Sequence, residues 1–140
     1  MNAKGPHEIL NPPELAPPLG FSHAVVPAVG RTVYLGGQTG VGLDGELRSK
    51  ELVGQFDAAA ENVVTALNAA GANPEHLVSL QIFTTDVEEY RARTSELAEV
   101  YGRHIGRHYP AIALFGIERL WDAEAMVELM GIAVIPDSVA

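Results

Sequence analysis

The sequence predicts a single α/β domain with the element order ββαβαββ, in which two helices cover one face of a mixed sheet. Two stretches with apolar residues at helical spacing alternate with short apolar runs rich in β-branched residues. Glycine and proline punctuate the chain between these segments. The length of 140 residues suits one domain with a hydrophobic core.

Composition excludes several classes of protein. Hydrophobic residues make up 47% of the chain and charged residues 19%, as in globular proteins. No apolar run is long enough to span a bilayer, and the N-terminus lacks the apolar core of a signal peptide, so we expect a cytoplasmic protein without a membrane partner. The absence of cysteine excludes disulfides and thiolate sites. A formal charge of −9 repels phosphate backbones, so we expect no nucleic-acid partner.

The chain begins with a proline-rich arm, residues 1–19, which we expect to be extended and without regular structure. The domain itself is predicted over residues 20–140. Residues 24–29 and 32–35 are short apolar runs on either side of a glycine, which predicts a β-hairpin.

The most clearly predicted helix has apolar residues at helical spacing from Leu52 to Ala70. Ser49 is the expected N-cap, and Gly71 is a suitable residue just past the end. A second helix is expected to start at Thr85 or Asp86 and to end before a proline at position 110. Further strands are expected over residues 77–83, 111–117 and 127–135.

The strands at residues 77–83 and 111–117 are apolar on both alternating faces. Two helices cover only one face of a sheet. Another copy of the chain is the simplest cover for the second face, so we predict an obligate homo-oligomer.

Two motifs have an ordinary structural explanation. Residues 40–45 match the G-x-G-x-x-G string of dinucleotide sites, but the next helix begins too late to meet a pyrophosphate, so we expect a turn. His104 and His108 have the spacing of metal ligands on a helix, but Gly106 lies between them and no third ligand is evident, so we expect capping of the helix end. We therefore predict no cofactor and no metal.

Glu128 lies inside the strongly apolar strand at residues 127–135 and is the leading catalytic candidate. A buried carboxylate is costly unless it is paired, protonated or hydrogen-bonded. Two structural explanations compete with catalysis: a pair with Arg119 or another cation, and hydrogen bonds to backbone amides in a subunit interface. A partly desolvated carboxylate is equally suited to moving protons or positioning water. Gly36 and Gly37, at the end of an earlier buried strand, permit close approach either by a ligand or by another backbone segment.

Several segments resemble the Rid (YjgF/RidA) family, in the same order, from about residue 20 to residue 136. They are residues 33–40, residues 61–71, the helix start at Asp86, the motif Tyr109-Pro110-Ala111, and residues 127–129. The resemblance implies a chorismate-mutase-like α/β domain that forms a homotrimer with three clefts between subunits. RidA-type members hydrolyse enamines and imines to ketones and ammonia.

The resemblance also implies the site residues. Phe21 stands at the family's tyrosine position and Gly36 at its strand-end serine, while Gly37 and the acidic Glu128 are kept. A second carboxylate of the family, two positions after Glu128, is here Met130.

The main departure is at Ile112, where RidA-type members have an arginine that binds a substrate carboxylate. This chain therefore resembles a divergent subgroup without that arginine, and Arg103 and Arg107 are the candidate replacements. Phe21, Ile112 and Leu114 are expected to make the cleft apolar. The predicted function is hydrolysis of the C=N bond of a small reactive metabolite. The alternative is a non-catalytic trimer that binds a small ligand or regulates another process.

Overall fold

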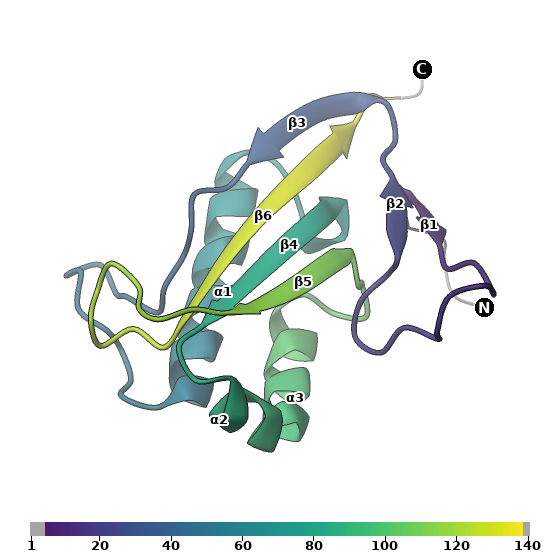
Figure 1. Ribbon diagram of the computed structural model, residues 1–140. Coiled ribbons are helices and arrows are strands. Elements are labelled where there is room, and N and C mark those ends of the chain that lie inside the picture. Colours follow the sequence, from purple (N-terminus) through teal and green to yellow (C-terminus); the bar gives the residue numbers. More distant parts are fainter. Residues whose placement is uncertain (1–4, 139–140) are drawn as a thin grey trace.

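The structure is a computed structural model that describes residues 5–138. A four-stranded mixed sheet with the strand order β3-β6-β4-β5 forms the centre, and a two-stranded sheet, β1-β2, lies at its side (Figure 1). The strands are β1 (Glu8–Leu10), β2 (Ala24–Val26), β3 (Gly30–Tyr34), β4 (Leu77–Thr84), β5 (Ala111–Gly116) and β6 (Val127–Pro136). The helices are α1 (Leu52–Ala69), α2 (Val87–Ala92) and α3 (Thr94–His104), with a 3₁₀ turn at Pro74–His76.

The central sheet mixes both strand directions. β4 and β5 are parallel and are joined by a crossover through α2 and α3, whereas β6 is antiparallel to both β3 and β4. The helices lie together on one face of the sheet (Figure 1), as the sequence predicts.

The expected second helix is divided into α2 and α3 at Arg93. Asp86 caps α2 as predicted, because its carboxylate accepts a hydrogen bond of 3.0 Å from the amide of Glu89. At the break, the Thr94 hydroxyl donates to the carbonyl of Arg91 at 2.8 Å. Such side-chain bonds compete with the helical hydrogen-bond ladder, which accounts for the interruption.

The prediction for α1 is confirmed in its extent and its end. Gly71 follows the C-cap with a φ of +82°, a conformation that favours glycine. The N-cap prediction is wrong, because the helix starts after Glu51. The hydroxyl of Ser49 accepts a 3.1 Å hydrogen bond from the amide of Glu51 and so stabilises the turn before the helix.

The predicted hairpin of residues 24–29 with 32–35 is wrong. β2 pairs with β1, and β3 pairs with β6. Gly30 belongs to β3, and its Cα lies so close to the carbonyl of Ile135 that a Cβ has no room there. The glycine therefore serves close strand packing and not a turn.

Strand β1 lies within the arm that was expected to lack regular structure. The buried side chain of His7 attaches this segment to the domain. Its Nδ1 accepts a 3.0 Å hydrogen bond from the amide of Ala28, and its Nε2 lies 2.9 Å from the carbonyl oxygen of His76. An imidazole with one accepting nitrogen has its proton on the other, so Nε2 is the donor.

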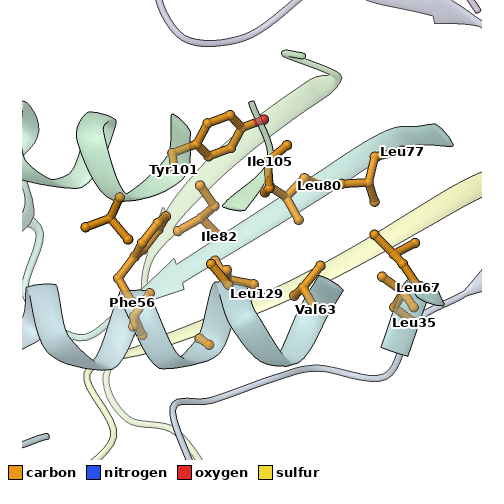
Figure 2. Packing of buried hydrophobic residues seen from close by; sticks show 14 of the residues in the cluster. Leu35, Phe56, Val63, Leu67, Leu77, Leu80, Ile82, Tyr101, Ile105 and Leu129 are labelled. Carbon is orange, nitrogen blue, oxygen red and sulfur yellow. The ribbon is translucent and has the colours of Figure 1, made fainter. Parts of the chain in front are cut away.

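The core lies between the central sheet and the helices α1 and α3 (Figure 2). Phe56 of α1 and Leu129 of β6 are 1% and 0% exposed. The opposite face of the sheet carries Tyr34, Phe115 and Met130, which are 77%, 45% and 40% exposed. Nothing within residues 5–138 covers these side chains. Within the same residues, no helix is both long enough and apolar enough to cross a membrane.

Candidate functional site

Glu128 lies near the start of β6, opposite Phe83 of β4 and on the sheet face away from the helices. The segment that follows β3 runs beside it, since Gln38 and Leu129 exchange backbone hydrogen bonds of 2.8 and 2.9 Å. A Cβ on Gly37 would lie 2.6 Å from Oε1 of Glu128 and 2.8 Å from its Cδ. The carboxylate therefore lies directly against Gly37, and a Cβ at this position would oblige the Glu128 side chain to shift.

The half-buried carboxylate of Glu128 forms no ion pair and no side-chain hydrogen bond within residues 5–138. Arg119 donates instead to the carbonyls of Leu120 and Trp121, at 3.2 and 3.4 Å. The alternative in which Glu128 pairs with Arg119 or another cation is therefore contradicted within the described chain. Hydrogen bonds to the amides of a second subunit stay a prediction.

The two neighbouring glycines differ in their surroundings. A Cβ on Gly36 would meet no atom within 4 Å, whereas one on Gly37 would collide with Glu128. Close approach thus explains Gly37 and gives no reason for glycine at position 36.

Phe21, Ile112 and Leu114 form a second group around a cavity of about 580 Å³ between β5 and the helices α2 and α3. In the sheet register Ile112 lies beside Leu80, and both side chains belong to the helix-covered face. The structure thus brings Gly37 to Glu128, and Phe21 to Ile112 and Leu114. Within one chain it leaves these two groups on opposite faces of the sheet.

Aromatic side chains make up much of the cavity wall. The rings of Tyr101 and Tyr109 stack at a centroid distance of 5.3 Å with planes 5° apart, and the Tyr101 hydroxyl donates to the carbonyl of His108 at 2.6 Å. Tyr90 meets Phe56 edge to face at 6.2 Å. Burial raises the pKa of Tyr90 to about 12, so this phenol is neutral at physiological pH.

Tyr90 and Tyr101 line the cavity but are not among the site residues predicted from the sequence. The signal available was the presence of hydroxyl groups on an otherwise apolar stripe. A buried tyrosine hydroxyl requires a partner or an opening.

Neither candidate replacement for an arginine at position 112 lines the cavity. Arg103 lies 3.7 Å from the carboxylate of Asp57. Arg107 lines a separate pocket with His7. No charged side chain lines the 580 Å³ cavity among residues 5–138.

The two histidines of the possible metal motif have separate partners. Nε2 of His104 lies 2.5 Å from Oδ1 of Asp57, a contact that holds the pKa of this carboxyl below its usual value. His108 bonds the carbonyl of Leu77 at 2.7 Å. The expected capping of the helix end is therefore replaced by bonds to α1 and β4. Residues 40–45 form the expected turn, in which the amide of Gly45 donates to the carbonyl of Gly42.

Residues 13–135 match the family model described as endoribonuclease L-PSP. The chain is 31% identical to protein DfrA of Myxococcus xanthus over 96% of this chain and 97% of that protein. It is 29% identical to a 2-iminobutanoate/2-iminopropanoate deaminase of Dermatophagoides farinae, over 93% and 98% of the two chains. Among solved structures, the Rid-family protein YyfB of Yersinia pestis, of unknown function, has a TM-score of 0.84 at 28% identity, covering 93% of this chain and 99% of that chain.

Proposed function

The chain belongs to the Rid family of endoribonuclease L-PSP-like proteins, and on this premise we propose that it hydrolyses the C=N bond of a small imine, or of the imine tautomer of an enamine, that carries no carboxylate. The observation that supports this most directly is Glu128, a half-buried carboxylate without a partner in the described chain that lies against Gly37. A free carboxylate in this setting is suited to proton transfer, whereas a paired one is not.

In the proposed reaction, Glu128 removes a proton from a water molecule while the water oxygen forms a bond to the imine carbon. The nitrogen gains that proton, the resulting carbinolamine loses ammonia, and a carbonyl group remains, so one water is consumed for each ammonia released. Backbone amides near Gly37 stabilise the developing negative charge. The second carboxylate of the family is replaced by Met130, so Glu128 carries each proton transfer alone.

The proposed assembly is a homotrimer with its active clefts between subunits. The exposed apolar face around Tyr34, Phe115 and Met130 supports this assembly, since such a face favours association. The division of the candidate site supports it too. A cleft that takes the cavity from one chain and Glu128 from its neighbour unites groups that one chain keeps on opposite sides of the sheet. We expect light scattering to give three times the mass of one chain, and a monomer at micromolar concentration contradicts the assembly.

The reaction is tested with imines that oxidases form in place. An amine oxidase with benzylamine supplies a neutral imine, and an amino-acid oxidase with leucine supplies a 2-imino acid. We expect faster release of ammonia from the neutral imine in the presence of the protein and little effect on the imino acid, because no cation lines the cavity. Hydrolysis of neither imine above the background rate contradicts the proposal.

Gly37→Ala tests the contact that positions the carboxylate. The new Cβ would lie 2.6 Å from Oε1 of Glu128, so the carboxylate must move. We expect turnover to fall by about 10- to 100-fold, since a displacement of about 1 Å misplaces a catalytic group. Gly102→Ala in α3 is the control, because its Cβ would also meet nothing within 4 Å and the residue lies outside the proposed site. Equal turnover in both variants argues against a role for the Glu128–Gly37 contact.

The alternative is a non-catalytic trimer that binds a small ligand or has a regulatory role. The absence of the family's second carboxylate and of a cation in the cavity favours it. This alternative predicts saturable thermal stabilisation by a ligand with no turnover of any imine.

A further inference from the structure

The cavity between β5 and the helices has a defined mouth and floor. The mouth is formed by residues that face solvent: Leu19 from the N-terminal loop, and Thr94 and Ala98 from α3. The floor is formed by buried side chains, among them Phe56 and Ile82, which lie side by side beneath Tyr101 in Figure 2. Its volume of about 580 Å³ falls in the range of small-molecule sites.

The lining of the cavity selects against charge of either sign. No acidic or basic side chain lines it among the described residues. Arg93, which precedes Thr94 of the mouth in the chain, is held at 3.2 Å by Glu89 and at 3.1 Å by Glu96. A carboxylate in the cavity would lose its water without gaining a cation, which is costly. An ammonium group would likewise find no carboxylate.

Two tyrosine hydroxyls of the lining remain for a ligand. The Tyr101 hydroxyl is engaged with the carbonyl of His108, whereas the hydroxyls of Tyr90 and Tyr109 make no hydrogen bond within residues 5–138. Of these two residues, Tyr109 is 39% exposed and Tyr90 is the more buried, so the Tyr90 hydroxyl is the one deeper in the cavity. No side-chain polar atom in that range is both fully buried and without a partner, so the Tyr90 hydroxyl reaches open space. Beside it, the stacked rings of Tyr101 and Tyr109 form a flat wall that suits a planar molecule.

We infer that the cavity binds the body of a neutral, planar aromatic molecule whose single hydrogen-bonding group meets the hydroxyl of Tyr90. This inference rests on the proposed function in that it names the class of substrate. An aromatic imine, with its ring against the tyrosine wall and its C=N nitrogen at the Tyr90 hydroxyl, is the substrate that fits.

The test compares 2-naphthol with 2-naphthoate, which share a ring system and differ in charge at pH 7. Equilibrium dialysis is expected to show saturable binding of 2-naphthol, at least about tenfold tighter than that of 2-naphthoate. Ala98→Trp fills the mouth from an exposed helical position and is expected to weaken 2-naphthol binding by about tenfold or more. Ala69→Trp is the control, an exposed alanine of α1 away from the cavity, and is expected to leave binding unchanged.

Tyr90→Phe removes only the hydroxyl and keeps the ring in place. We expect it to weaken 2-naphthol binding by roughly three- to tenfold, as the loss of one hydrogen bond does, and to leave naphthalene binding unchanged. Equal binding of the two naphthalene derivatives, or unaltered 2-naphthol binding in Ala98→Trp, overturns the inference. Hydrolysis of neutral imines without 2-naphthol binding leaves the proposed function standing and removes this inference. Binding of 2-naphthol without hydrolysis of any imine supports this inference about the cavity and contradicts the proposed hydrolysis.

Discussion

Glu128→Gln is expected to hydrolyse neutral imines at least about 100-fold more slowly than the natural chain, the usual scale of general acid–base catalysis. The amide keeps the size of the side chain and its contact with Gly37 but accepts no proton from water. Ammonia release from the imine of benzylamine, formed by an amine oxidase, measures the effect.

Glu118→Gln is the matched control for that experiment. It removes the same charge from an exposed position in the loop before β6 and is expected to keep full turnover. Binding of 2-naphthol by Glu118→Gln should also be unchanged, since Glu118 does not line the cavity. Unchanged turnover in Glu128→Gln removes the carboxylate from the mechanism.

Ile112→Arg is expected to increase hydrolysis of 2-imino acids by about 10- to 100-fold, the scale of a charge-assisted hydrogen-bonded pair. The half-buried Ile112 lines the cavity, so a guanidinium at this position meets a substrate carboxylate where the chain now has no cation. A partly exposed site lets the long side chain keep its charged end hydrated when no substrate is bound. The measurement is ammonia release from the imine of leucine, formed by an amino-acid oxidase.

Ile112→Met separates charge from length in this experiment. Methionine is long and apolar, so it is expected to give no gain on 2-imino acids. Vigorous hydrolysis of 2-imino acids by the natural chain contradicts the view that the isoleucine excludes them. An equal gain in the methionine variant shows that space, and not charge, limits the reaction.

The fold was predictable where local chemistry decides it. The spacing of apolar residues and the glycine at position 71 define α1, and the Asp86 side chain defines the start of α2. The pairing of β3 was not predictable in this way. A glycine at position 30 is compatible both with a tight turn and with a strand packed closely against Ile135, and the sequence does not distinguish the two because Ile135 is more than 100 residues away.

The candidate site was predictable in part. Glu128 is conspicuous as the one charge in an apolar strand, and the resemblance to the Rid family supplies Phe21 and Ile112. Their separation to opposite sheet faces follows from strand register, since Glu128 pairs with Phe83 and Ile112 with Leu80, two positions of β4 that point to opposite faces. The role of Tyr90 as a free hydroxyl was hidden, because a helix face with tyrosines has the same pattern whether its rings fill a core or border a cavity.

Because Glu128 and the cavity of each proposed cleft come from different chains of the trimer, two different inactive variants can complement one another. A chain that has lost its carboxylate still offers an intact cavity, and a chain with a blocked cavity still offers its carboxylate. Two such defective chains, co-assembled in equal amounts, complement one another. Random mixing in a closed ring leaves about one cleft in four with both intact halves. Activity thus reappears in a mixture of two proteins that are each inactive alone. A cell that carries one variant without the carboxylate and one with a blocked cavity therefore keeps part of its activity.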